Sequence, residues 1–104
     1  MFQLFPVPDV PYIQIYQKPI NMRWGEKKLT ALCREEGVDP DDGGVFLFFN
    51  AKRDALKLLF RDATGWQEIV RSVPRGGFML PAPQEGESFT KIARSKLSSI
   101  FRAA

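Results

Sequence analysis

Basic side chains gather in the second half of this 104-residue chain. Residues 50–104 hold ten Lys or Arg against five Asp or Glu, whereas residues 1–49 hold five against seven. Cations in loops and on strands are the groups with which proteins contact nucleic-acid phosphates, so this asymmetry predicts a polyanionic partner. The candidate phosphate-contacting residues are Lys52, Arg53, Lys57, Arg61, Arg71 and Arg75.

Catalytic chemistry has little support in the composition. The chain has no histidine, which excludes a Ser-His-Asp triad, a Cys-His dyad, a zinc site of the His type and an imidazole pH switch. Asp54 and Asp62 are the carboxylates that a metal-dependent nuclease would use, but Asp in such loops typically caps its own turn. We therefore predict a protein that is not an enzyme and has no cofactor or metal, with a nuclease as the alternative.

Residues 45–78 predict the central element that positions these cations. Three apolar runs of strand length alternate with loops rich in Asn, Asp, Gly and Pro, which is typical of an antiparallel meander. The first run, 45–49, is apolar throughout, so we expect it to be covered on both faces, by the two predicted helices. A loop over 50–54 would carry Lys52 and Arg53 at its tip, and 73–77 would form a further turn that exposes Arg75.

The turn at 62–65 sets the expected strand register. A type I turn followed by a left-handed Gly65 would pair Asp62 with Trp66 and Lys57 with Arg71. One face of the sheet would then carry cations, and the other would face the core. The predicted basic face consists of Lys57, Leu59, Arg61, Gln67, Ile69 and Arg71; the predicted core face consists of Leu56, Leu58, Phe60, Trp66 and Val70.

The flanking segments complete an α+β prediction. Prolines at 6, 8 and 11 indicate an extended N-terminal arm over 1–11, followed by a strand over 12–16. A helix is expected over 22–36, with Asn21 as N-cap and Gly37 as stop. A short strand over 78–80 and a C-terminal helix over 89–102, capped by Ser88, would follow. The predicted fold is an antiparallel meander of about four to five strands with one helix before it and one C-terminal helix packed on the sheet.

Length and composition predict one domain over 12–104. A hydrophobic content of 44% with nine Phe provides enough apolar area for a single core. No apolar run is long enough to cross a bilayer, and the start lacks a basic signal-peptide region, so we expect a cytoplasmic protein that does not associate with membranes. The C-terminal helix could also lie on a membrane surface, but core helices have the same pattern. The single cysteine, Cys33, is expected in the core.

Two stretches resemble a known family. The stretch "PINMRWGEKKLTAL" carries Met22, Arg23, Gly25, Leu29 and Leu32, and "VFLFFNAKRDALKLLFRDATGW" carries a Phe-rich strand, an Arg-containing turn, a strand containing Lys57, and then Asp, Gly and Trp. With Arg71, Arg75, Gly76, Phe78 and Pro81, this order resembles the TnpB-type (Orf2-like) accessory proteins of the bacterial insertion-sequence family numbered sixty-six. The resemblance spans roughly residues 12–102.

The resemblance implies participation in the transposition of a mobile element, without the catalytic role of the recombinase. One hypothesis is an accessory protein that contacts DNA phosphates through the basic sheet face and its loops, which supplies affinity without base reading. The alternative is a protein-interaction subunit that docks on the transposase of the same element, through a sheet edge or the Pro-rich arm, and does not bind DNA itself.

Overall fold

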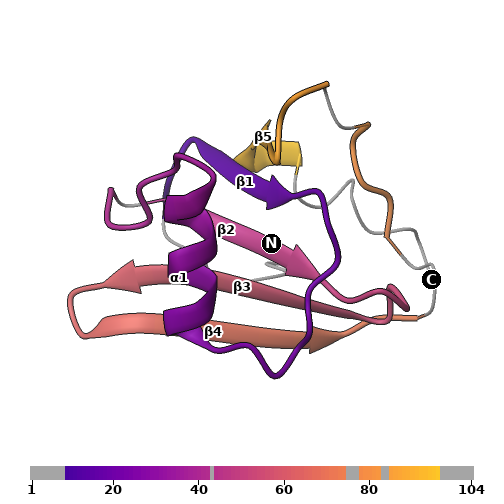
Figure 1. Cartoon of the computed structure of the whole chain (residues 1–104), viewed down its shortest axis with the longest axis horizontal. Helices are drawn as coiled ribbons and strands as arrows, with labels where there is room; N and C mark the ends of the chain where they lie inside the picture. Colours follow the sequence, from indigo (N-terminus) through magenta and orange to yellow (C-terminus); the bar gives the residue numbers. More distant parts are fainter. Residues whose placement is uncertain (1–8, 43, 75–77, 83–84, 97–104) are drawn as a thin grey trace.

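The computed structural model describes residues 9–42, 44–74, 78–82 and 85–96. Within them, five strands form one sheet in the order β4-β3-β2-β1-β5, and a single α-helix crosses one face of it (Figure 1). The elements are β1 (Tyr12–Tyr16), α1 (Glu26–Glu35), β2 (Val45–Phe49), β3 (Ala55–Asp62), β4 (Gly65–Ser72), β5 (Phe89–Ala93) and the 3-10 turn η1 (Arg94–Lys96).

The sheet confirms the α+β class, but it is mixed rather than wholly antiparallel. β2, β3 and β4 form the predicted antiparallel meander. β1 pairs with β2 in parallel, with Ile13 opposite Val45 and Ile15 opposite Leu47. The reason is the helix between them: parallel neighbours need a crossover connection, and α1 supplies it by returning the chain to the end of the sheet where β1 began.

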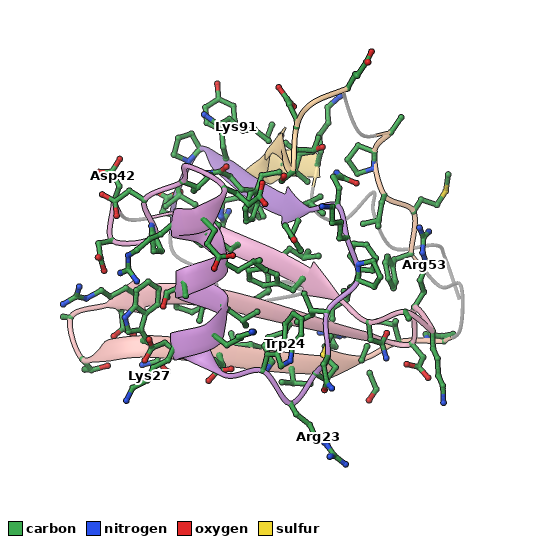
Figure 2. All side chains as sticks on the ribbon, viewed as in Figure 1. Arg23, Trp24, Lys27, Asp42, Arg53 and Lys91 are labelled. Atoms are coloured by element: carbon green, nitrogen blue, oxygen red, sulfur yellow. The ribbon has the colours of Figure 1, made fainter. Side chains whose placement is uncertain are left out.

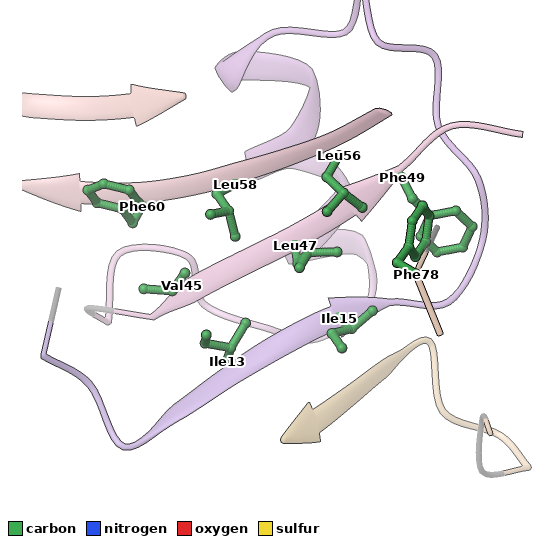
Figure 3. Packing of buried hydrophobic residues seen from close by; sticks show 9 residues of the cluster. All are labelled: Ile13, Ile15, Val45, Leu47, Phe49, Leu56, Leu58, Phe60 and Phe78. Carbon is green, nitrogen blue, oxygen red and sulfur yellow. The ribbon is translucent and has the colours of Figure 1, made fainter. Parts of the chain in front are cut away.

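The middle of the sheet is covered on both faces, which explains why every residue of β2 is buried. Phe46 and Phe48 point to the face that α1 covers, where they pack with Leu29, Cys33 and Leu59. The opposite face carries a second cluster, which includes Phe78 from the segment after β4 (Figure 3). Its buried members are Ile13, Ile15, Val45, Leu47, Phe49, Leu56, Leu58, Phe60 and Phe78.

Helix α1 is shorter than predicted at its start. Asn21 caps a turn instead of the helix, because its Oδ1 accepts a hydrogen bond from the Arg23 N–H at 2.8 Å. Gly25 is the actual N-cap residue and has no side chain to cap with. The predicted stop is confirmed: Gly37 has φ 78°, and its N–H and that of Val38 bind the Arg34 and Cys33 carbonyls in a Schellman motif.

The predicted C-terminal helix is wrong over the part of it that the structure describes. Residues 89–93 form β5, antiparallel to β1, with Tyr16 opposite Phe89 and Tyr12 opposite Ala93. Phe89 and Ile92 are three residues apart, which suits a helix face, but in the strand they enter the clusters on opposite faces of the sheet. Residues 97–102 of that prediction lie outside the described residues.

The predicted β3–β4 register is wrong by one residue. Asp62 pairs with Gly65 and not with Trp66, and Lys57 therefore lies opposite Val70 and not opposite Arg71. Asp62 Oδ1 accepts hydrogen bonds from the Thr64 N–H at 2.8 Å and the Thr64 hydroxyl at 2.6 Å, which closes a two-residue turn. Because a one-residue slip moves every side chain of a strand to the other face, the predicted basic face does not form.

The first eight residues of the predicted arm, and the turn residues 75–77 that include Arg75, lie outside the described residues. The predicted strand at 78–80 is reduced to an isolated bridge at Phe78. No helix in the described part of the chain is long and apolar enough to span a membrane.

Candidate nucleic-acid interface

The loop between β2 and β3 is the best-defined basic element of the structure. Asn50 organises it: its Oδ1 accepts hydrogen bonds from the Asp54 N–H at 3.1 Å and the Ala55 N–H at 3.2 Å, and its Nδ2 donates to Asp54 Oδ1 at 2.6 Å. The Arg53 N–H also donates to the Asn50 carbonyl at 3.0 Å. The side chains of Lys52 and Arg53 are exposed on this framework, as predicted from the sequence.

Arg53 has an uncommon backbone conformation and a contact with an aromatic ring. It is the one non-glycine residue in the described chain with a positive φ, 57°, a region that Gly and Asn occupy more readily than Arg does. Its guanidinium carbon lies 5.5 Å from the centroid of the Phe49 ring, which is within the range of a cation–π contact. The Phe49 ring in turn packs against Phe78, at a centroid distance of 6.1 Å. The guanidinium thus lies over a buried ring that is itself packed in the core.

Arg71 lies at the same end of the sheet as this loop. It pairs across the strands with Leu56, and just beyond it the Val73 N–H donates to the Asp54 carbonyl at 2.9 Å. Figure 2 shows Arg53 at this end and Asp42 at the opposite one. Three of the six predicted residues, Lys52, Arg53 and Arg71, are therefore brought together.

Lys18 also lies at this end of the sheet, although the charge pattern does not place it among the candidates. The chain after β1 runs beside the end of β2, where the Ile20 N–H donates to the Phe49 carbonyl at 2.8 Å, so the exposed Lys18 lies at the same end of the sheet as the 50–54 loop. This neighbourhood depends on the parallel β1–β2 pairing, which the charge pattern does not reveal. We call Lys18, Lys52, Arg53 and Arg71 the basic end.

Arg61 lies at the other end of β3 and is paired within the protein. Its Nη1 is 3.1 Å from Asp41 Oδ1, and Arg34 Nη2 is 3.0 Å from Asp41 Oδ2. The Asp41 carboxylate thus links the last turn of α1 to the end of β3. Asp39, Asp42 and Asp62 are exposed in the neighbouring loop and turn, so the surroundings of Arg61 are acidic.

Lys57 is a buried structural residue in this fold. Its side chain is only 5% exposed, and its ammonium donates to the carbonyls of Met22 at 3.0 Å and Trp24 at 2.8 Å. Glu68 Oε1 lies 3.1 Å from the same nitrogen. All three ammonium protons are therefore satisfied inside the protein. The prediction that Lys57 belongs to an exposed basic surface is therefore wrong. Lys57 is buried because α1 and the turn before it cover that face of the sheet.

The two aspartates considered for catalysis serve turns instead. Asp54 binds Asn50, and Asp62 binds Thr64, whose hydrogen bonds lower the pKa of the Asp62 carboxyl. Asp54 directly precedes β3 and Asp62 ends it, so they are roughly 26 Å apart at the rise of a strand and do not share a site. Among the described residues, no group of three or more His, Cys, Asp or Glu side chains is placed to hold a metal ion.

Taken together, the fold and the site describe a small α+β module with cations gathered at one end of a mixed sheet. The chain belongs to the IS66 Orf2 like protein family, whose pattern matches residues 12–103. Comparisons with curated proteins and with solved structures gave no match. The family is associated with an insertion sequence, in agreement with the resemblance seen in the sequence.

The structure also explains why two of the family-like stretches occur together. Lys57, from the Phe-rich and Lys-containing stretch, donates to the carbonyls on either side of Arg23 in the Met-Arg-Trp-Gly stretch. Gly25, which ends that stretch, has the Glu68 carboxylate as its neighbour: a Cβ there would lie 3.9 Å from Glu68 Oε2. These residues hold the start of α1 on the sheet.

Proposed function

We propose that this chain is a non-catalytic accessory protein of insertion-sequence transposition, and that it contacts the DNA backbone through the basic end. The observation that carries the proposal is the gathering of Lys52, Arg53 and Arg71 at one end of the sheet, while Lys57 is buried and Arg61 is paired with Asp41. Backbone contacts of this kind give affinity with little sequence preference. Arg75 remains a candidate for the same surface by its sequence position.

The opposite end of the sheet supports an oriented contact. Exposed Asp39, Asp42 and Asp62 would repel phosphates there, so a duplex is expected to approach from the side of the 50–54 loop. The proposed role is positional: the protein holds DNA while the transposase performs the strand chemistry.

Fluorescence anisotropy with a labelled DNA duplex tests this proposal. The logarithm of the association constant should fall linearly with the logarithm of salt concentration, with a slope of about −0.9 per phosphate contacted. The variant Lys52→Ala/Arg53→Ala should bind more weakly and with a shallower slope. Lys27→Ala/Lys28→Ala removes the same charge from exposed positions on α1 and is the matched control. Absence of binding at low salt, or equal losses in both variants, would reject the basic end as a DNA interface.

The non-catalytic part of the proposal has a separate test. Plasmid DNA incubated with the protein and Mg²⁺ or Mn²⁺ should remain intact. Cleavage that disappears in Asp62→Ala and persists in Asp42→Ala would contradict the proposal and establish a nuclease.

A second candidate function is docking on the transposase without DNA contact. β4 forms one edge of the sheet that the described strands build, and its Val70 is 58% exposed, which is a suitable surface for strand addition by a partner. A pull-down with the transposase of the same element distinguishes the two. Association that survives nuclease treatment favours protein docking, and association that is lost favours bridging by DNA.

A further inference from the structure

The backbone of Arg53 is unusual for the residue that occupies it. At φ 57°, Gly or Asn would be accommodated with less strain, and the Asn50 network fixes the loop whichever side chain stands at 53. The loop's fold therefore does not explain an arginine there. What the arginine adds is a guanidinium that lies over the Phe49 ring.

This ring contact prepares the guanidinium for a ligand that presents two acceptor oxygens side by side. A guanidinium held against an aromatic face has its rotations restricted, while its N–H edge stays open to solvent and can donate two parallel hydrogen bonds. Phosphodiester oxygens match this fork, whereas a lysine ammonium offers only a point charge. The neighbouring Lys52 is exposed and has no such ring contact among the described residues.

We infer that Arg53 is the principal phosphate contact of the protein: it makes a two-pronged contact with a single phosphodiester group, and Phe49 is its positioning residue. This inference rests on the proposed DNA function and gives it a specific geometry. Lys52 and the other cations of the basic end contribute long-range electrostatic attraction to the DNA.

Arg53→Lys tests the geometry, because it keeps the charge and removes the fork. We expect duplex DNA to bind about five- to tenfold more weakly at every salt concentration, since one or two charge-assisted hydrogen bonds are lost. The slope against salt should not change, because the number of neutralised phosphates is the same. Lys52→Ala is the contrasting variant: its slope should become shallower by about 0.9, and its affinity loss should shrink as salt rises.

A second variant separates binding from folding. Arg53→Asn suits the left-handed backbone, so its melting temperature should stay within about 4 °C of the wild type, because the relief of backbone strain and the loss of the ring contact are of similar size. Its DNA affinity should fall at least as far as that of Arg53→Lys. A large drop in melting temperature would assign Arg53 a structural role and overturn the inference.

The DNA affinities of Arg53→Lys, Lys52→Ala and the wild type distinguish failure of the inference from failure of the proposed function. Wild-type affinity in Arg53→Lys would show that a point charge suffices and would overturn the inference, while the proposed function would stand if Lys52→Ala still weakened binding. If neither variant nor the wild type bound DNA at low salt, the proposed function itself would fail.

Discussion

Lys57 Nζ lies 3.1 Å from Glu68 Oε1, and this pair joins β3 to the edge strand β4 beside the segment that leads into α1, the only α-helix in the described chain. The same ammonium holds the Met22 and Trp24 carbonyls, which explains why helix α1 begins later than its apolar pattern suggests. Those carbonyls point to Lys57 instead of continuing a helical ladder. Lys57 therefore anchors the segment that leads into α1 on the sheet.

Replacing Lys57 by Met should be strongly destabilising. The substitution leaves the Glu68 carboxylate and two carbonyls without their donor, and we expect the free energy of unfolding to fall by about 2 to 4 kcal/mol. Urea denaturation followed by tryptophan fluorescence measures this loss. Lys52→Met, at an exposed loop position, should change stability by less than about 0.5 kcal/mol. Similar small effects in both variants would contradict the structural role of Lys57.

Arg61 should matter less for DNA binding than Arg53 does. Because Asp41 already pairs with Arg61, a phosphate would have to displace that carboxylate within acidic surroundings. Arg61→Ala should therefore reduce affinity by less than about twofold, against a clear loss in Arg53→Ala. Titrations of both variants with the same duplex test this, and equal losses would return Arg61 to the interface.

The Asp41 bridge should contribute modestly to stability. The Asp41 side chain is 43% exposed, and exposed ion pairs typically contribute about 0.2 to 1 kcal/mol each to stability. Asp41→Asn should lower the free energy of unfolding by no more than about 2 kcal/mol, and the loss should diminish as salt screens the pairs. Asp42→Asn removes the same charge at the adjacent position and is the control. A loss that is independent of salt would argue against an ionic origin.

Gly37 should resist substitution for reasons of backbone conformation alone. Its φ is 78°, and no atom lies within 4 Å of where a Cβ would be placed, so Gly37→Ala meets no steric contact. The left-handed conformation should nevertheless cost about 1 kcal/mol of stability. Gly37→Asn should cost less, since Asn tolerates this region better. Thermal denaturation of the two variants gives the order, and an unchanged or more stable Ala variant would refute this explanation.

Cys33 should make stability fall at alkaline pH. Burial raises the pKa of its thiol to about 11, above its unfolded value, so the folded state retains the proton longer than the unfolded state does. The corresponding stability is fully present below the unfolded pKa and is lost as pH rises through 9 toward 11. Cys33→Ala should flatten this part of the profile. Denaturation curves between pH 8 and 11 measure it, and identical slopes in both proteins would contradict the prediction.

Local patterns predicted most of the elements, because their signals lie in neighbouring residues. The alternation of residues 12–16, the apolar run 45–49 and the Gly37 stop each depend on a few adjacent side chains. The loop with Lys52 and Arg53 at its tip is likewise predicted by its own sequence. These parts required no knowledge of distant contacts.

Features that depend on tertiary contacts do not follow from local sequence patterns. Phe89 and Ile92 have helical spacing, and only their pairing with β1 makes them a strand. The hairpin register depends on whether Asp62 closes a two-residue or a three-residue loop. With the observed two-residue loop, Arg71 lies opposite Leu56 and not opposite Lys57. Lys57 looked like a surface cation because its partners, the carbonyls of Met22 and Trp24, are more than thirty residues away.

The pairing of β1 with β5 has a consequence for how the protein is made. β1 is the first strand of the described chain and β5 is the last, and they are neighbours in the sheet. During synthesis the outer edge of β1 stays unpaired until residues 89–93 have left the ribosome. The β2–β3–β4 meander can form earlier from local contacts. A nascent chain stalled before residue 89 would therefore expose β1 as an unfinished edge to which chaperones or other chains could add.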